Sequence, residues 1–182
     1  MPRNIEIKAR IENVAQLTPK VAALASEGPL EIAQDDTFFT CDNGRLKLRA
    51  FSNDAGELIY YRRANQSGPK ESFYLRSPTT SPESLRESLS LAYGQIGRIR
   101  KYRSLFLVGR TRVHLDRVEG LGHFLELEVV LVDDESTEQG IREAGQLMEQ
   151  LGVKPEQLVE GAYLDLIQAG ERAPVPTLEP AS

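Results

Sequence analysis

Short segments in which apolar and charged residues alternate recur along most of this 182-residue chain. Side chains two residues apart share one face of a strand, so alternation of this kind predicts β-strands. Turn-forming residues such as Asp42-Asn43-Gly44 separate many of the segments, and neighbours should therefore pair as antiparallel hairpins in a meander. The eight predicted strands are residues 4–12, 36–41, 44–51, 57–63, 71–77, 99–108, 109–117 and 123–132.

Helical spacing of apolar residues interrupts the strands in a few places. Asn13 or Thr18 could cap the first helix, and Pro19 could divide it into two short pieces. The chain ends in a proline-rich tail after Gly170. We expect one α+β, mainly β domain over residues 1–170 and a disordered tail over residues 171–182. The predicted helices are residues 14–26, 82–93, 136–151 and 160–168.

Bulk composition excludes several classes of protein. No apolar run approaches the roughly 20 residues that a membrane span requires, so we expect no membrane role. The start MPRNIEIK lacks an apolar signal core and Cys41 has no partner for a disulfide, which predicts a cytoplasmic protein. A net charge of −5 argues against a nucleic-acid partner, although the basic stretch RIRKYR at 98–103 keeps that alternative open.

On several of the predicted strands, the charged residues that share one face carry the same sign. An antiparallel sheet whose polar side faces water explains any one such face. Like charges side by side along whole strands instead indicate that a ligand or a facing strand compensates them. Arginine outnumbers lysine there, and its planar guanidinium fits phosphate oxygens. For residues 57–63 the sequence leaves open which pair lies on the charged face of the strand, Tyr60 with Arg62 or Tyr61 with Arg63. The other faces hold Arg45, Lys47 and Arg49; Lys101 and Arg103; Arg110, Arg112, His114 and Asp116; and Glu126 and Glu128.

Eight antiparallel strands can close into a barrel, and closure would bring these faces together in one lumen. Basic side chains could then hold a triphosphate. Carboxylates in the same lumen would supply hard oxygen ligands for Mg²⁺ or Mn²⁺, and the neighbouring cations would keep them ionised. The acids that could serve in this way are Glu6, Asp116, Glu126 and Glu128.

Several longer motifs carry a resemblance to a known family. They are NIEIKAR at 4–10, DTFF at 36–39, GRLKLR at 44–49, LIYYRR at 58–63, the stretch from KYRSLF to FLELE at 101–128, and GAYLDLI at 161–167. With them the chain resembles, over about residues 3–168, the CYTH family of triphosphate tunnel metalloenzymes. That family includes class IV adenylyl cyclases, thiamine triphosphatases and inorganic tripolyphosphatases. The resemblance implies an eight-stranded antiparallel closed β-barrel, the triphosphate tunnel, with helices packed outside.

The resemblance also implies roles for particular residues. Glu6, Asp116, Glu126 and Glu128 should hold Mg²⁺ or Mn²⁺, with Asp116 alternatively orienting Arg112 or a water. Lys8, Arg112 and Asp116 are the predicted catalytic residues. The motif's first acid is replaced by Asn4, which removes one negative charge from the metal shell. The predicted phosphate contacts, for each of which an external salt bridge is the alternative, are Lys8, Arg45, Lys47, Arg49, Arg62, Lys101, Arg103, Arg110 and Arg112.

The implied partner is a small triphosphate: ATP, tripolyphosphate or thiamine triphosphate. By resemblance the leading hypothesis is a metal-dependent adenylyl cyclase that forms cyclic AMP and pyrophosphate. The alternatives are a triphosphatase and, because of Asn4, a weakly active module that binds polyphosphate or nucleotide. His114 shares a strand face with Asp116, but a single histidine is more often a structural hydrogen-bonding group than a general base.

Overall fold

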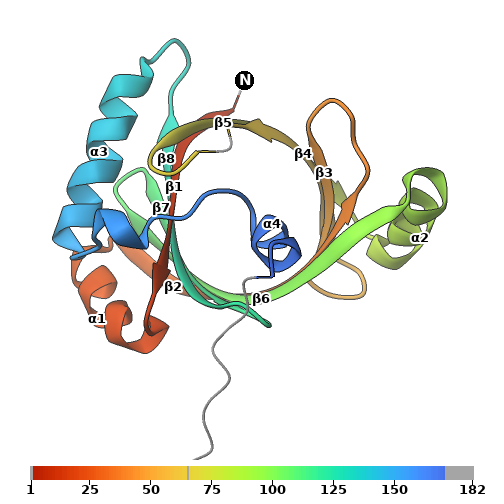
Figure 1. Cartoon of the computed structure of the whole chain (residues 1–182), viewed down its shortest axis with the longest axis horizontal. Coiled ribbons are helices and arrows are strands. Elements are labelled where there is room, and N and C mark those ends of the chain that lie inside the picture. Colours follow the sequence, from red (N-terminus) through yellow and green to blue (C-terminus); the bar gives the residue numbers. More distant parts are fainter. Residues whose placement is uncertain (1, 65, 171–182) are drawn as a thin grey trace, which may run out of the picture.

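A closed barrel of eight antiparallel strands forms the body of the molecule (Figure 1). The computed structural model describes residues 2–64 and 66–170. This architecture confirms the predicted mainly β class and the eight-stranded ring, whereas the prediction for residues 171–182 lies outside the described residues. The strands are β1 (Arg3–Ile11), β2 (Glu27–Phe39), β3 (Arg45–Ala50), β4 (Gly56–Arg63), β5 (Lys70–Thr79), β6 (Gln95–Val108), β7 (Thr111–Val118) and β8 (Gly122–Leu131).

The order of strands around the ring is β1-β5-β4-β3-β2-β6-β7-β8. Strands β2 to β5 and β6 to β8 are two runs of antiparallel hairpins. The predicted meander is correct within each run and wrong at two joins. There, α1 (Val14–Leu24) and α2 (Pro82–Tyr93) connect strands that are not neighbours, so that β1 pairs with β5 and β8, and β2 pairs with β6.

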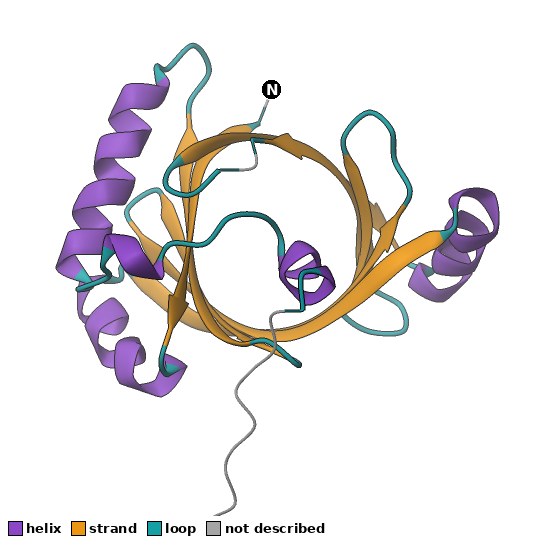
Figure 2. Cartoon of the chain, viewed as in Figure 1, coloured by secondary structure: helices purple, strands orange, loops and turns teal. Residues whose placement is uncertain are grey.

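The helices lie outside the ring with one exception (Figure 2). Helices α1 and α3 (Thr137–Gln150) lie on one side and α2 on the opposite side, whereas α4 (Tyr163–Gln168) lies within the outline of the ring. Helix α1 begins after Asn13, whose side chain accepts a hydrogen bond from the N–H of Ala15 at 2.7 Å. It continues through Pro19 as one helix. Among the described residues, no helix combines the length and apolarity needed to cross a bilayer.

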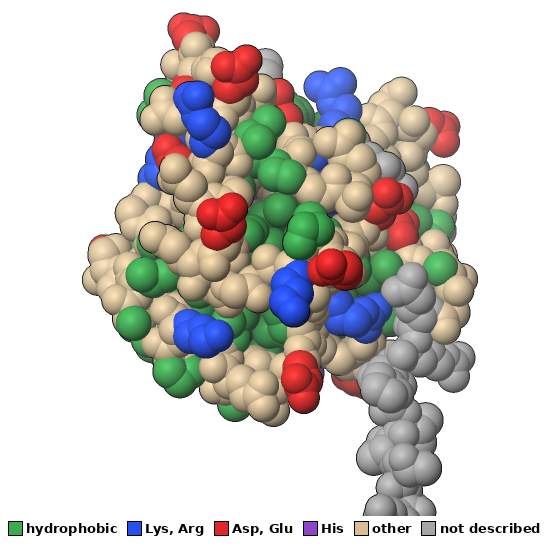
Figure 3. Space-filling model, turned by 60° about the vertical axis from the view of Figure 1, so that its left-hand side comes forward, with side chains coloured by type: hydrophobic (Ala, Val, Ile, Leu, Met, Phe, Trp, Pro, Cys, Tyr) green, Lys and Arg blue, Asp and Glu red, His purple; other side chains and the backbone are tan. Residues whose placement is uncertain are grey.

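The main apolar core lies between the barrel wall and helices α1 and α3. Ile5, Ile7 and Ala9 on the outer face of β1 are at most 3% exposed and pack there with Val21 of α1 and Leu147 of α3. Burying an aliphatic side chain of this kind stabilises the fold by about 1.5–3 kcal/mol. Because side chains alternate along a strand, packing the apolar face of β1 outward turns Asn4, Glu6 and Lys8 inward. The outer surface differs from the lumen: on the face in Figure 3, acidic and basic side chains are interspersed.

A second apolar cluster joins α4 to the inside of the barrel. Tyr163 and Leu164 of α4 pack with Phe38 and Ile99, two residues that point into the lumen. Gly97 of β6 makes this approach possible, because a Cβ atom at that position would lie 2.2 Å from Cδ1 of Leu164. Helix α4 therefore occupies part of the lumen and limits the space left for a ligand.

Candidate active site in the barrel lumen

The barrel encloses a cavity of about 220 Å³ to which all eight strands contribute side chains. Among the residues that the structure describes, eight Lys and Arg side chains line it against five carboxylates, a formal surplus of three positive charges in a chain whose net charge is −5. A cavity of this charge attracts a polyanion. The cations are Lys8, Lys47, Arg49, Arg63, Arg76, Lys101, Arg103 and Arg112, and the acids are Glu6, Asp36, Glu57, Glu126 and Glu128.

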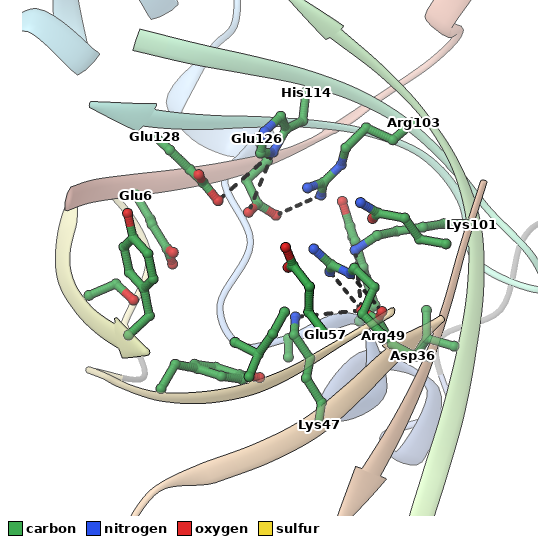
Figure 4. Close-up of a pocket in the computed structure, with 18 of the residues that line it drawn as sticks. Glu6, Asp36, Lys47, Arg49, Glu57, Lys101, Arg103, His114, Glu126 and Glu128 are labelled. Atoms are coloured by element: carbon green, nitrogen blue, oxygen red, sulfur yellow. Dashed lines mark hydrogen bonds and ion pairs between the residues drawn. The ribbon is translucent and has the colours of Figure 1, made fainter. Parts of the chain in front are cut away.

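One side of the lumen is a cluster of cations held by Asp36 of β2 (Figure 4). Arg49 donates hydrogen bonds from Nε and Nη2 to the two Asp36 oxygens at 2.8 and 2.7 Å. The ammonium groups of Lys47 and Lys101 lie 3.5 and 3.7 Å from the same carboxylate. Burial alone would raise the pKa of Asp36, but the charges of Arg49, Lys47 and Lys101 outweigh it and hold the pKa far below its usual value.

Asp116 of β7 positions Arg103 of β6. Arg103 donates from Nε and Nη2 to the Asp116 oxygens at 2.8 and 2.7 Å, and the hydroxyl of Tyr163 donates to the same carboxylate at 2.7 Å. Asp116 is fully buried, and Arg103 outweighs the effect of burial, so the pKa of Asp116 is lowered. The ring of Tyr163 lies 4.0 Å from the ammonium of Lys8 and 4.9 Å from that of Lys101. Asp116 thus orients Arg103, whereas the sequence suggested either a metal ligand or a residue that orients Arg112 or a water.

The opposite side of the lumen carries the acids. Strand register brings Glu6 of β1 beside Glu128 of β8. Glu6 accepts a hydrogen bond from Nη1 of Arg63 at 2.8 Å, and Glu128 accepts one from Nε of Arg112 at 2.8 Å. Burial raises the pKa of Glu6, and Glu126 and Glu128 raise it further despite Arg63. The Glu6–Arg63 and Glu128–Arg112 pairs therefore lie where three carboxylates, including that of Glu126, come close together.

His114 of β7 faces these acids. Its Nδ1 atom lies 3.9 Å from one oxygen of Glu126 and 3.9 Å from one oxygen of Glu128. Burial, followed by the charge of Arg103, lowers the pKa of His114 to about 4, so the imidazole is neutral at neutral pH. Donor atoms of His114, Glu126 and Glu128 all lie within 4.8 Å of one another. The three residues form a candidate site for a divalent metal ion.

Most of the predicted site residues reach the lumen. Arg45 instead forms an ion pair with Asp165 of α4 at 2.7 Å. Asp116 is hydrogen bonded to Arg103 and does not itself line the cavity. Of the predicted phosphate and metal ligands, those that line the cavity are Glu6, Lys8, Lys47, Arg49, Lys101, Arg103, Arg112, Glu126 and Glu128.

Two predicted phosphate contacts, Arg62 and Arg110, are not brought to the lumen. The guanidinium of Arg62 lies 5.2 Å from the centre of the Phe73 ring, on the outer face of β4. Arg110 lies in the turn between β6 and β7, where it forms hydrogen bonds of 2.7–2.9 Å with Glu135 and Glu143. Both guanidinium groups have partners away from the cavity, so we leave them out of the proposed ligand set.

Sequence reasoning missed several lumen residues. Register pairs Arg45 with Tyr61, which turns Tyr61 and Arg63 inward and Arg62 outward. Pairing β2 with β3 could have found Asp36, because it lies opposite Arg49. Tyr163 lies in the motif GAYLDLI, but nothing in the sequence indicates that this motif returns to the lumen. The missed lining residues are Gln34, Asp36, Glu57, Arg76 and Tyr163, and Arg63 was left as the open alternative to Arg62.

The fold is a closed barrel whose lumen is lined by charged side chains, and comparison with known proteins identifies the family. The CYTH domain model matches residues 2–163, so the chain belongs to the CYTH domain family. The adenylate cyclase CyaB of Aeromonas hydrophila is 28% identical to it over 172 residues, 90% of this chain and 88% of that protein.

Solved structures share the fold over nearly the whole chain. The PH1012 protein of Pyrococcus horikoshii OT3 has a TM-score of 0.80 at 24% identity and covers 90% of this chain and 98% of its own. The structure described as a putative adenylyl cyclase from Hippeastrum with a dominant triphosphatase activity has a TM-score of 0.64 at 14% identity, covering 96% and 98%. At these identities the likeness establishes the tunnel fold.

Proposed function

We propose that this protein is a divalent-metal-dependent enzyme that converts ATP to cyclic AMP and pyrophosphate in the barrel lumen. The observation that carries the proposal is the division of one cavity in the barrel lumen into a cationic side and an acidic side. A triphosphate needs cations for its oxygens and a metal to bridge them, and this lumen offers donors for both. The whole-length similarity to an adenylate cyclase supports the choice of reaction.

The cationic side would bind the phosphates. Arg49 and Arg103 are held by two hydrogen bonds each to Asp36 and Asp116, so their guanidinium groups are oriented before a ligand arrives. Such preorganisation lowers the entropy cost of binding and stabilises charge that develops in the transition state. Lys47, beside Arg49, adds a charge that Asp36 does not fully neutralise.

The acidic side would hold Mg²⁺ or Mn²⁺ through Glu6, Glu126 and Glu128, and the bound ion would neutralise phosphate charge and stabilise the departing pyrophosphate. Lys8 lies between the two sides, 3.6 Å from Glu126. Burial lowers the pKa of Lys8 to about 8, with Glu126 partly opposing this, so its ammonium can hold or release a proton near neutral pH. Cyclisation requires the ribose 3′-hydroxyl to lose a proton as its oxygen bonds to the α-phosphorus and pyrophosphate leaves. We propose that Lys8 accepts this proton or, as an ammonium, stabilises the negative charge that develops on the 3′-oxygen.

A triphosphatase is the second candidate, and the size of the cavity favours it. Pockets for organic ligands usually measure about 300–1,000 Å³, whereas this lumen, narrowed by α4, measures about 220 Å³. An inorganic triphosphate fits such a space more readily than a whole nucleotide. In this reaction a water would attack the terminal phosphorus in place of the ribose hydroxyl. The triphosphatase activity in the description of the Hippeastrum structure is a further reason to test this reaction.

Product identification separates the candidates. The purified chain is incubated with ATP, tripolyphosphate or thiamine triphosphate in the presence of Mg²⁺ or Mn²⁺. Cyclic AMP and pyrophosphate from ATP are the expected products. Orthophosphate from tripolyphosphate or thiamine triphosphate, without cyclic AMP from ATP, would favour the triphosphatase. Binding of all three without turnover would leave a binding module and overturn both enzymatic assignments.

A matched pair of variants tests whether the lumen is responsible. Arg49 inside the barrel and Arg98 outside it are each held by two hydrogen bonds to an aspartate, Asp36 and Asp35 respectively. Arg49→Gln should reduce kcat/KM by about 100-fold or more, the scale of losing a preorganised charge donor, and Arg98→Gln should leave it within about twofold. Equal effects of the two substitutions would contradict a reaction inside the lumen.

A further inference from the structure

We propose that His114 is a metal ligand of the lumen and that, with Glu126 and Glu128, it makes one ion site select Zn²⁺ or Co²⁺ over Mg²⁺. The inference rests on the proposed function only in expecting a metal ion in this cavity. It adds a nitrogen donor to a site otherwise composed of oxygens.

The arrangement of the two carboxylates is the first argument. In each of them the Oε2 atom faces a cation: Arg112 binds Oε2 of Glu128 at 2.6–2.8 Å, and Lys8 lies 3.6 Å from Oε2 of Glu126. The Oε1 atoms of both carboxylates face Nδ1 of His114 instead, each at 3.9 Å. Three donor atoms from two adjacent strands therefore point toward one position.

The distances suit a shared ion better than a direct contact. At 3.9 Å, neither carboxylate forms a hydrogen bond with the imidazole, because such bonds span about 2.7–3.2 Å. Two ligands bound at about 2.1 Å lie between about 3.0 Å apart, when they are at right angles, and about 4.2 Å apart, when they are opposite. Both separations fall inside that interval.

The state of the imidazole nitrogen is an independent argument. Nδ1 of His114 is buried and has no hydrogen-bond partner in the structure, and the residue as a whole is 4% exposed. Buried polar atoms in proteins are nearly always hydrogen bonded, because an unpaired buried polar atom destabilises the fold. An unpaired nitrogen directed at two carboxylate oxygens is explained when a cation occupies the space between them.

The ligand set predicts which ions the site selects. Mg²⁺ prefers an all-oxygen octahedral shell, and imidazole suits Zn²⁺ and the later first-row ions. A shell with one nitrogen donor is therefore less suited to Mg²⁺ than to these ions.

The test uses nuclear magnetic resonance of the full chain with ¹⁵N-labelled histidine. The chain has two histidines, and His123 serves as an internal control because its Nδ1 already accepts a hydrogen bond from the N–H of Val14 at 2.9 Å. Zn²⁺, added without any triphosphate, should shift the Nδ1 signal of His114 by coordination and leave that of His123 in place. Absence of Zn²⁺ binding, or binding without a shift at His114, would overturn the proposal.

Two variants give a second, calorimetric measurement. His114→Asn keeps a polar atom near the position of Nδ1 but replaces nitrogen by an amide oxygen. It should weaken Zn²⁺ and Co²⁺ binding by about tenfold or more, since even loss of a ligand's hydrogen-bond partner costs 10–100-fold, and should change the Kd for Mg²⁺ by less than about twofold. The control, His123→Asn, should change none of these constants. An equal loss for all three ions would assign His114 a purely structural role.

The outcome is separable from that of the proposed function. Turnover of triphosphates with Mg²⁺ and an unchanged His114 signal on adding Zn²⁺ would leave the proposed function standing and refute the nitrogen ligand. A Zn²⁺-induced shift at His114 in a chain that turns over no triphosphate would do the reverse. If His114→Asn does not fold, the spectra of the wild-type chain decide the question alone.

Discussion

Asp36 holds three cations of the lumen in place, so its replacement by asparagine is the most informative perturbation. Asp36→Asn preserves the shape of the side chain and removes its charge. Arg49 would lose its charged partner, and Lys47 and Lys101 would lose a carboxylate 3.5 and 3.7 Å away. We expect the metal-free and ligand-free protein to become less stable.

The magnitude follows from burial. Asp36 is 1% exposed, and removing one partner of a buried ion pair costs about 3–5 kcal/mol because the other charge remains without compensation. For a chain of this length 1 kcal/mol corresponds to about 2–4 °C in Tm, so Tm should fall by about 6–20 °C. The two lysines can each release a proton, which places the expected loss near the lower end. The pKa of Asp36 is lower in the folded than in the unfolded chain, so its contribution is full at neutral pH and declines as pH falls below about 4.

The assay is thermal and urea unfolding with and without tripolyphosphate. A ligand in the lumen supplies the negative charge that the variant lacks. Tripolyphosphate should therefore raise the Tm of Asp36→Asn by more than that of the wild type. Asp35→Asn is the matched control, because Asp35 is the neighbouring residue with the same bidentate pairing, to Arg98, on the exposed outer face. Exposed pairs contribute about 0–1 kcal/mol, so this variant should be nearly as stable as the wild type.

Two results would refute the reasoning. If Asp36→Asn and Asp35→Asn lost the same stability, the lumen would not be a site where uncompensated cations are costly. If tripolyphosphate stabilised the wild type and Asp36→Asn equally, the anion would bind somewhere other than beside Arg49, Lys47 and Lys101.

Three further predictions concern other residues of the lumen. Burial, followed by the charge of Arg49, lowers the pKa of Lys47 to about 8, so the affinity of the metal-free protein for tripolyphosphate should decrease above that pH. Lys47→Arg should reduce the slope of log Kd against pH by about one, because arginine stays charged, and an unchanged slope in calorimetry would contradict this. Tyr163→Phe leaves buried Asp116 without one hydrogen bond and should cost about 1–3 kcal/mol in urea unfolding, so that unchanged stability would show the bond to be dispensable. Asn4→Glu adds a carboxylate to the acidic side; it should lower the Tm of the metal-free protein and tighten Mn²⁺ binding, and the prediction fails if neither changes.

Alternation was sufficient to predict the strands in which one face is apolar and the other charged. The segment predicted at 4–12 is β1 within one residue at each end, and the predicted helix at 82–93 coincides with α2. Strand β2 was predicted from residue 36 only and in fact begins at Glu27. Its first residues are mostly exposed and carry no alternating pattern, since pairing with β6 and not burial holds them in the sheet.

The sequence of β4 alone could not predict which of its alternate side chains point into the lumen. Tyr60 with Arg62 and Tyr61 with Arg63 are equally amphipathic choices, and only the register with β3 decides between them. The sequence also could not reveal that α4 returns to the lumen. That position depends on contacts between residues far apart in the chain, such as the bond from Tyr163 to Asp116.

The location of a bound triphosphate tests the central claim most directly. A crystal of the wild-type chain grown with tripolyphosphate and Mn²⁺ would show both, with the manganese identified by its anomalous scattering. We predict phosphate oxygens against Arg49, Lys47 and Arg103, and manganese between them and Glu126. A triphosphate bound only on the outer surface, with the lumen side chains still paired to one another as they are here, would contradict the account.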